Sequence, residues 1–247
     1  EEELPYFILG NGSNLLVSDK GYRGVIIQLY RNFSNISVEG NEICASSGAL
    51  LSQIAAAARN ASLTGFEFAG GIPGTLGGAV FMNAGAYGGE LKDVLKEAVV
   101  MTEQGEILTL PVEKLEMGYR TSRIKKAGYL VLEARLVLEQ GDMDKIRDIT
   151  KDLTEKRVSK QPLEYPSAGS TFKRPEGYFA GKLIMDAGLR GYQVGDAQVS
   201  EKHCGFVINK GNATAADVLT LIENVREKVQ EQFGVTLEPE VKFLGEF

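Results

Sequence analysis

A dense run of glycines in the first third of the chain constrains the fold most strongly. The stretch "GFEFAGGIPGTLGGAVFMNAGAYGGE", residues 65–90, holds nine of the chain's 29 glycines. Glycine lets a backbone turn sharply and bring its N–H groups close to a ligand. A smaller loop, "GNGSN" at residues 10–14, follows the apolar segment "PYFIL". Two such loops suit a diphosphate with a large group at each end, although tight turns in a compact fold are the alternative interpretation.

Neither loop carries a common nucleotide-binding pattern. A Rossmann fingerprint that begins at Gly10 would need a glycine at position 15, where Leu15 stands instead. A P-loop would need Gly-Lys-Ser or Gly-Lys-Thr, and neither glycine segment contains it. The two loops therefore predict a phosphate cradle of another kind.

The rest of the chain alternates strand and helix patterns, which points to an α+β fold. Alternating apolar residues predict strands in a hairpin that turns at Gly40-Asn41, in a second hairpin at 94–110, and at 5–9, 24–29, 129–139 and 235–244. In the last of these strands we expect one face to be apolar and the other to carry Glu238 and Glu240. The residues expected on the apolar face are Val235, Leu237, Val241 and Phe243.

Three segments have helical spacing. The clearest follows a capping box formed by Thr214 and Asp217, and Gly234 provides its stop signal. Its apolar stripe consists of Val218, Ile222, Val225 and Val229. A second amphipathic helix ends near Pro162, and its apolar residues are Ile146, Ile149 and Leu153. The third covers residues 50–61.

Composition excludes several classes of function. With 43% hydrophobic and 24% charged residues, the chain has the profile of a soluble globular protein. A net charge of −6 argues against a general nucleic-acid surface or an anionic membrane patch, but leaves room for a local basic pocket. No run of about twenty apolar residues predicts a membrane span. The two cysteines form neither a disulfide framework nor a metal-binding spacing, so we expect no metal site and a reducing cytoplasm.

A serine in "YPSAGSTFKRP", residues 165–175, raises a chemical question. Ser170 lies in a glycine-flanked turn, as a nucleophile often does, but the pattern G-x-S-x-G is absent. The chain has a single histidine, His203, and its surroundings do not resemble a catalytic-base loop. We therefore expect that Ser170, if it is chemically active, donates a proton instead of attacking a substrate. A backbone-capping serine is the alternative.

Five segments in order resemble one known family. They are "LGNGSNLLVSD", "AGGIPGTLGGAVFMNAGAYGGE", "GYRTS", "PSAGSTFKRP" and "LEPEVKFLG". Together they are similar to the UDP-N-acetylenolpyruvoylglucosamine reductases, usually called MurB, in the shorter type without an inserted substrate loop. The resemblance implies an FAD-binding domain of the vanillyl-alcohol-oxidase type, followed by an α+β substrate-binding domain.

The two prolines of "QPLEYP" suggest where these domains meet. We expect an FAD-binding domain over residues 1–160 and a substrate-binding domain over 161–247. The family carries a further flavin-lobe segment before "LGNGSN", so we expect the N-terminal lobe to be incomplete in the printed chain.

The resemblance also implies which residues contact FAD and which carry the chemistry. The FAD candidates are Gly10, Asn11, Gly12, Ser13, Asn14, Gly71, Ile72, Pro73, Gly74, Thr75, Gly77, Gly78, Asn83, Ala84 and Gly85. Ser170 matches the family's proton donor, and Arg120 matches the arginine that stabilises the enol carboxylate. Glu240 matches the catalytic glutamate, which we expect to be protonated or neutralised. Glu238 is its rival.

The reaction implied by the resemblance is an NADPH-dependent reduction of UDP-N-acetylglucosamine enolpyruvate to UDP-N-acetylmuramate, in peptidoglycan precursor synthesis. Further candidates for substrate contact are Tyr119, Arg174, Arg190 and His203. We expect a cytoplasmic monomer whose only partners are small molecules. Two alternatives remain open: another FAD oxidase or dehydrogenase of the same superfamily, and a non-catalytic protein that binds sugar nucleotides.

Overall fold

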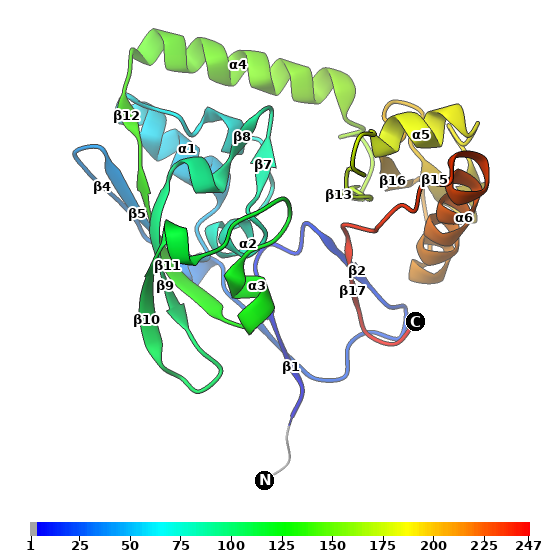
Figure 1. The fold of residues 1–247 in the computed structure, drawn as a ribbon, viewed down its shortest axis with the longest axis horizontal. Helices are drawn as coiled ribbons and strands as arrows, with labels where there is room; N and C mark the ends of the chain where they lie inside the picture. The colour runs from blue at the N-terminus through cyan, green and yellow to red at the C-terminus, as the bar shows by residue number, and fades with distance from the viewer. Residues whose placement is uncertain (1–3) are drawn as a thin grey trace. The chain divides into compact units, whose positions relative to one another are not determined.

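The computed structural model describes residues 4–247 of the chain. They form two compact units (Figure 1). The first contains the described residues up to Gly12 together with Val25–Arg157, and the second contains Ser13–Gly24 together with Val158–Phe247. The chain therefore leaves the first unit in the middle of the "GNGSN" loop and returns to it twelve residues later.

The first unit is organised around a five-stranded antiparallel sheet. Its strand order is β10 (Ile107–Pro111), β9 (Leu95–Met101), β11 (Leu130–Val137), β5 (Glu42–Ser46) and β4 (Ile36–Glu39). The predicted hairpins are confirmed, because β4 and β5 meet at Gly40-Asn41 and β9 and β10 are adjacent. Alternate residues of the central strands, including Val100 and Ala134, point into a buried core.

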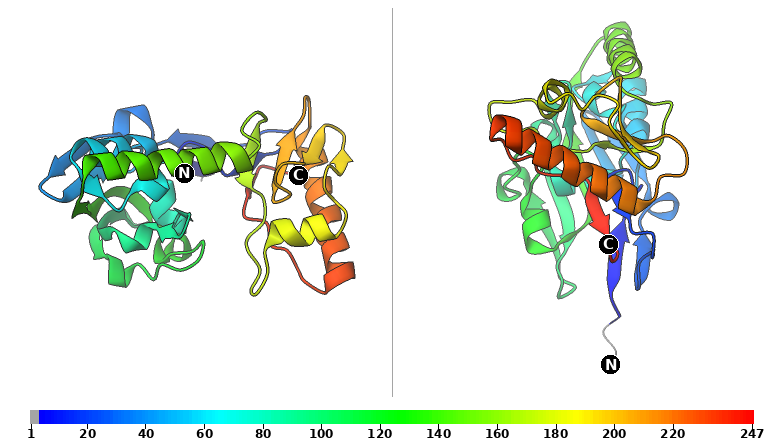
Figure 2. Two further views of the ribbon diagram at one scale, coloured as in Figure 1. Left: turned by 90° about the horizontal axis from the view of Figure 1, so that it is seen from above. Right: turned by 90° about the vertical axis from the view of Figure 1, so that its right-hand side faces the viewer.

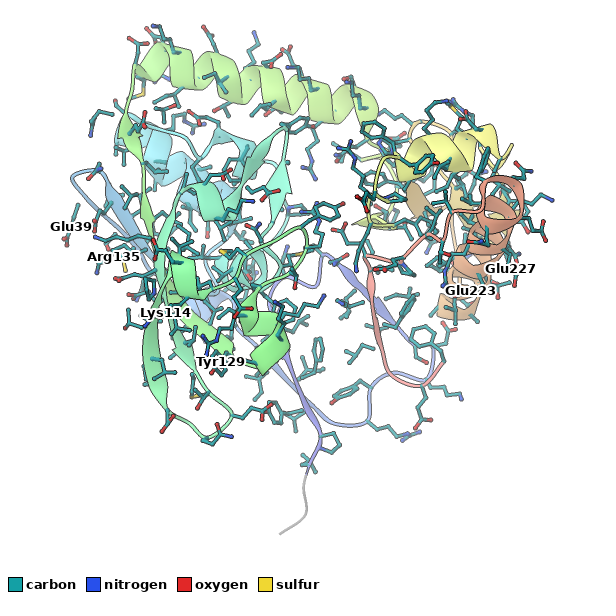
Figure 3. The ribbon with its side chains drawn as sticks, viewed as in Figure 1. Glu39, Lys114, Tyr129, Arg135, Glu223 and Glu227 are labelled. Carbon is teal, nitrogen blue, oxygen red and sulfur yellow. The ribbon has the colours of Figure 1, made fainter. Side chains whose placement is uncertain are left out.

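Helices cover one face of this sheet. They are α1 (Leu51–Asn60), α2 (Leu76–Met82) and the short α3 (Arg123–Ala127). Leu51, Ile54 and Ala58 of α1 are buried, as their spacing predicts. Figure 3 shows Arg135 of β11 on the side away from these helices, where it pairs with Glu42 and Glu97. The sheet is thus apolar on the helix side and charged on the other.

Helix α4 (Met143–Lys160) packs alongside α1. Its inward face consists of Ile146, Thr150, Leu153, Thr154 and Arg157, which line one cavity together with α1. Ile149 was expected on the apolar stripe, but it is 44% exposed. That part of the prediction was wrong because Ile146, Thr150 and Leu153, at i, i+4 and i+7, define a face that Ile149 misses.

Shorter elements complete the first unit. β1 (Tyr6–Leu9) and β3 (Val25–Gln28) form a parallel pair, and β7 (Gly85–Ala86) and β8 (Gly89–Glu90) form a tight hairpin. β6 (Leu63–Thr64) pairs with β12 (Glu139–Gln140). Single 3₁₀ turns occur at Arg31–Phe33, Glu67–Ala69, Leu91–Asp93 and Val112–Lys114.

The second unit is built on a four-stranded antiparallel sheet. Its order is β13 (Ser167–Ser170), β16 (Phe206–Asn209), β15 (Ala197–Val199) and β14 (Gln193–Val194). Helix α6 (Ala215–Phe233) lies against β14 and β15, and α5 (Ala180–Asp186) packs against α6 (Figure 2). A separate core of buried side chains joins these elements.

The predicted signals of α6 are confirmed. The Thr214 side chain accepts a hydrogen bond from the Asp217 N–H, and the Asp217 carboxylate accepts one from the Thr214 N–H. Gly234 ends the helix with φ of 67°, in the left-handed region that favours glycine. Ile222 and Val225 are fully buried. Val229 is buried as well, and Val218 packs against the core from a partly buried position.

The expected strand at 235–244 is largely wrong. Only β17 (Lys242–Leu244) is a strand, and it pairs in parallel with β2 (Leu15–Val17). Pro239, which has no N–H to donate, makes an isolated bridge with Phe172. Leu237 and Val241 are buried as expected, but Phe243 is 40% exposed and Leu244 faces the core instead. Pairing with β2 therefore sets a register that the local sequence does not contain.

Two expectations about the whole chain can be compared with the structure. Both cysteines, Cys44 and Cys204, are free thiols. Within residues 4–247, no helix has the length and apolar character needed to cross a bilayer.

Candidate functional site

Within the first unit, residues 10–12 of the smaller glycine loop lie against the larger glycine loop. Asn11 donates a side-chain hydrogen bond of 2.6 Å to the carbonyl oxygen of Pro73. A side chain on Gly10 would clash with the Thr75 hydroxyl. Gly12 has φ of 68°, which a residue with a side chain rarely adopts. Glycine is therefore required at this contact, and residues 10–12 and 73–75 form one surface.

Helix α2 begins at this surface. Its first two N–H groups, from Leu76 and Gly77, donate to the carbonyl oxygens of Ala49 and Ser47 at 2.8 Å each. A Cβ on Gly77 would lie only 2.9 Å from the Ser47 Cβ, whereas one on Gly78 would meet nothing closer than 3.8 Å. Gly77 is thus a packing requirement, and Gly78 leaves backbone that a ligand can approach. A loop of this kind fits the phosphate groups of FAD.

Asn83, another FAD candidate, holds neighbouring segments together. Its side chain is 1% exposed, and its backbone is left-handed with φ of 47°. Its amide donates to Glu90 at 2.9 Å and to the Gly118 carbonyl at 3.2 Å, and its oxygen accepts from the Lys92 N–H at 3.0 Å. The Lys92 ammonium, with help from the Asn83 amide, keeps the pKa of Glu90 below its usual value. Asn83 therefore joins the β7–β8 hairpin to the turn that carries Arg120.

Arg120 lies in a tight turn of the first unit. Gly118 and Thr121 exchange two backbone hydrogen bonds of 3.0 and 3.2 Å, which leaves Tyr119 and Arg120 at the tip. Arg120 has φ of 55°, a strained value for a side-chain-bearing residue. Its guanidinium donates to the Gly85 carbonyl at 3.4 Å and lies 5.2 Å from the centre of the Tyr119 ring. Two candidates therefore share one tip.

Ser170 ends a bulged strand of the second unit. Between β13 and β16, Ser167 pairs with Ile208 and Ser170 with Phe206, so the first strand carries one extra residue. Gly169 absorbs the distortion with φ of 84°. Such bulges re-aim a side chain. The Ser170 side chain is exposed, and its one hydrogen bond among the described residues is a long one of 3.4 Å to the Phe172 carbonyl.

Glu240 lies beside this strand. Its N–H donates to the Thr171 carbonyl at 2.7 Å, and its own carbonyl accepts from the Asn14 amide at 3.1 Å. The rival Glu238 is held by Lys173, whose ammonium lies 2.5 Å from the Glu238 carboxylate. The structure therefore brings Ser170 and Glu240 together in one unit, whereas Arg120 belongs to the other.

The remaining substrate candidates differ in how firmly they are held. Arg190 donates to the Glu201 carbonyl at 2.9 Å and contacts the sulfur of Met185. The Arg174 guanidinium lies 4.0 Å from the centre of the Phe179 ring, and its Nε donates to the Tyr178 carbonyl. Arg190 is thus anchored to backbone, and Arg174 extends along an exposed aromatic segment.

His203 is close to Ser170. Its Nδ1 accepts a hydrogen bond of 3.1 Å from the Gly205 N–H. A Cβ on Gly205 would lie 2.9 Å from the His203 ring and 3.6 Å from the Ser170 oxygen. Burial lowers the pKa of His203, which favours the neutral ring with its proton on Nε2. Gly205 therefore keeps the space between the histidine and the serine open.

Three features of the site were not found from the sequence. Gly169 supplies the bulge before Ser170, Asn14 holds Glu240 and Arg157 of α4 covers Gly71. The only sequence signal for the positive φ at position 169 is that the residue there is a glycine. The other two depend on contacts between distant parts of the chain, for which the local sequence gives no signal.

Comparisons with known proteins place the chain in a family. The family described as "UDP-N-acetylenolpyruvoylglucosamine reductase, C-terminal domain" matches residues 161–244, and the one described as "FAD binding domain" matches residues 1–111. A reductase of that name from Clostridium botulinum (strain Eklund 17B / Type B) is 60% identical over 246 residues, which cover 100% of this chain and 81% of the relative. One from Agathobacter rectalis is 59% identical over 257 residues, covering 99% and 82%.

A solved structure supports the same assignment. The crystal structure of the MurB reductase from Thermus caldophilus is 38% identical, with a TM-score of 0.86, and the match covers 98% of this chain and 86% of that one. The predicted α+β fold and the FAD-binding domain are confirmed by these matches. The chain belongs to the UDP-N-acetylenolpyruvoylglucosamine reductase family.

Proposed function

We propose that the chain reduces UDP-N-acetylglucosamine enolpyruvate to UDP-N-acetylmuramate, with NADPH as the source of electrons. Its membership of the reductase family and its match to an FAD-binding domain support this activity. Reduction of the substrate's vinyl group requires a hydride at the terminal carbon and a proton at the carbon beside the carboxylate. Bound FAD supplies the hydride, and the chain's own side chains must supply the rest.

The exposed hydroxyl at the end of β13 carries the proposal. Hydride addition leaves carbanion or enol character on the carbon beside the carboxylate, and such a carbon is strongly basic. A weak acid such as the Ser170 hydroxyl can protonate it when correctly placed. The hydroxyl is exposed and makes only one long hydrogen bond, of 3.4 Å, among the described residues. Its proton is therefore little engaged by the protein.

Two charged residues complete the proposed chemistry. Negative charge grows on the substrate carboxylate during the reaction, and a guanidinium can bind a carboxylate through two parallel hydrogen bonds. We assign this role to Arg120, whose turn fixes the backbone that bears it. Glu240, held beside Ser170 through Thr171, is the catalytic glutamate of the proposal. The choice of Glu240 over Glu238 follows the family motif, and Glu238 is paired with Lys173.

The proposed activity also suggests a cellular location, an oligomeric state and a class of partners. NADPH and sugar nucleotides are cytoplasmic metabolites, and we propose a cytoplasmic monomer. The free thiols suit a reducing compartment, and the net charge of −6 suits small-molecule partners better than nucleic acid. We assign the residues Tyr119, Arg174, Arg190 and His203 to substrate contact.

An anaerobic mix in two steps tests the proposal. NADPH is added to the yellow holoenzyme while the visible flavin absorbance is followed, and the enolpyruvyl substrate is added after the colour has bleached. Return of the colour without oxygen supports both half-reactions. Bleaching without return contradicts the reductase and favours another flavin dehydrogenase. Binding of the substrate without any change of colour favours a protein that only binds sugar nucleotides.

A further inference from the structure

A small cavity lies between α1 and α4 in the first unit. Its volume is about 100 Å³, well below the roughly 300–1,000 Å³ of pockets that enclose a whole ligand. Its wall includes Gly70 and Gly71 of the FAD loop, Tyr87 and two arginines, Arg59 and Arg157. It is therefore a place for part of a ligand, next to backbone that the sequence assigns to FAD.

Arg157 is seated directly on Gly71. A Cβ on Gly71 would lie 3.1 Å from Cδ and 3.2 Å from Nη1 of Arg157, and its three nearest atoms would all belong to that side chain. Any residue larger than glycine would force the Arg157 side chain to shift by a few tenths of an ångström. The last inward-facing position of α4 thus places a cation on the backbone of the glycine loop.

The charge of Arg157 is not compensated by the protein. Two other cations of α4 have acidic partners on the same helix: Arg147 pairs with Asp144 and Lys156 with Asp152. Within residues 4–247, Arg157 makes no comparable ion pair or hydrogen bond. Burial also lowers its pKa, so the surroundings disfavour its charge.

The acidic group in the same cavity does not supply the missing charge. Glu67 accepts hydrogen bonds from the Thr64 hydroxyl at 2.7 Å and from the Gly65 N–H at 2.8 Å. Arg157 is only partly buried. Partial desolvation of a cation without a partner is still unfavourable, and a bound group of opposite charge would offset it. The cavity is therefore complementary to an anion.

We propose that Arg157 neutralises an anionic group of bound FAD at the Gly71 loop. The inference rests on the FAD-binding function of the family and not on turnover of any substrate. FAD offers two anions of this kind, the diphosphate and the reduced flavin ring. A guanidinium can form charge-assisted hydrogen bonds with either.

Titration of FAD into apoprotein tests the proposal, with flavin fluorescence as the readout. We expect Arg157→Ala to weaken binding of oxidised FAD by about ten- to a hundredfold if the diphosphate is the partner, since hydrogen bonds to charged groups contribute at this level. If the reduced ring is the partner, oxidised FAD binds almost normally and the midpoint potential falls. Unchanged affinity together with an unchanged potential overturns the proposal.

Two further variants separate this effect from misfolding and from general charge. Arg157→Lys keeps the charge and should recover part of the loss. Arg59→Ala removes a cation from the wall of the same cavity, and we expect the FAD affinity to change less than twofold and the midpoint potential to stay nearly the same. An equal loss in Arg59→Ala would show that only the net charge of the cavity matters, which contradicts a specific role for Arg157. Melting curves of the apoproteins confirm that each variant folds.

A double variant tests the contact between Gly71 and the Arg157 side chain. Gly71→Ala should displace the Arg157 side chain and weaken FAD binding, since the new Cβ would lie 3.1 Å from it. In the Arg157→Ala background the same change should cost much less, because the crowded side chain is gone. Losses that multiply in full would contradict the contact as the route of the effect. Both readouts concern FAD alone, so they stay interpretable even if the enolpyruvyl substrate proves wrong.

Discussion

The Arg120 turn and the Ser170 strand solve the same structural problem in opposite ways. Each presents a side chain to which we assign a chemical role, at or next to a residue with left-handed backbone. At the first, Arg120 itself has φ of 55°. At the second, Gly169 takes the positive φ, 84°, and Ser170 keeps strand geometry. In the first unit the left-handed residue and the residue with the assigned role are the same, Arg120. In the second unit they are two residues, Gly169 and Ser170.

This difference determines what each site can tolerate. A non-glycine residue in the left-handed region costs about 1–2 kcal/mol, and the neighbouring structure must hold it there. Around Arg120 the holding contacts are the Gly118–Thr121 bridge, the Gly85 carbonyl and the Tyr119 ring. Around Ser170 the strain is removed by sequence, and the backbone is fixed through the hydrogen bonds of Thr171 to Gly205 and Glu240. The first site depends on its contacts and the second on a glycine.

The largest effect is expected for Ser170→Ala. Loss of a positioned proton donor typically slows a reaction by about 10²–10⁴-fold. We expect kcat for the enolpyruvyl substrate to fall by this amount while bleaching of the flavin by NADPH is unchanged. Rapid-mixing measurements of the two half-reactions check this. Ser167→Ala, three residues away on the same strand, serves as the control, and an equal fall there would point to a damaged strand instead of a lost donor.

Arg120→Lys should have the next largest effect. Lysine keeps the charge and the backbone strain but cannot bind a carboxylate with two parallel bonds. Because hydrogen bonds to charged groups contribute about 1.5–3 kcal/mol, we expect kcat/KM to fall about ten- to a hundredfold. The melting temperature should hardly change. Normal kcat/KM with lysine would mean that charge alone is sufficient at this position.

Gly169→Ala places a residue with a side chain in the left-handed region beside Ser170, the same backbone strain that Arg120 already has. A Cβ there would meet nothing within 4 Å, so the cost is purely conformational and amounts to about 1 kcal/mol in the free energy of unfolding. We also expect kcat to fall, because the strand relaxes and re-aims Ser170. Gly105→Ala is a matched control, with φ of 82° and equally open space in the β9–β10 turn. It should lose the same stability and keep its activity.

Sequence reasoning succeeds where the structural signals are local. The glycine loops, both hairpins and the caps of α6 were predicted because their signals are local: turn residues, alternation and a capping box. That both loops suit a phosphate ligand was inferred from their glycines, but the contact between residues 10–12 and 73–75 is seen only in the structure. A left-handed φ at glycine is local as well, and it is therefore readable in principle.

The predictions that were wrong concern features set by contacts with distant parts of the chain. The register of β17 is set by β2, more than 220 residues earlier in the chain, so alternation within residues 235–244 placed Phe243 on the wrong face. Along α4, a choice between Ile149 and Thr150 decides which face turns inward, and hydrophobicity favoured the wrong one. Arg157 was missed for the same reason. Its position matters only once α4 is placed against the glycine loop.

Arg120→Gly and Arg120→Ala form a pair that isolates backbone strain in the first unit. Both remove the guanidinium and should be equally inactive, but only alanine keeps a Cβ in the left-handed region. We expect the glycine variant to be more stable than the alanine variant by about 1 kcal/mol, measured by urea unfolding. Equal stabilities would mean that the turn relaxes when the arginine is lost, and the contrast with Gly169 would disappear.

The smallest effect concerns the histidine near Ser170. Burial lowers the pKa of His203 below its ordinary value of 6.5, so below that pH the unfolded chain binds more protons than the folded one. The contribution of His203 to stability is therefore complete above about pH 6.5 and is lost as the pH falls. His203→Asn keeps an acceptor for the Gly205 N–H without a titrating ring, so its stability should fall less between pH 7 and pH 5.

Because the chain has one histidine, its NMR titration reports this site alone. A pKa at or above 6.5 would contradict a desolvated ring beside Ser170. A lower value would confirm that the serine site is supported by neutral groups, in contrast to the charged and strained turn of Arg120.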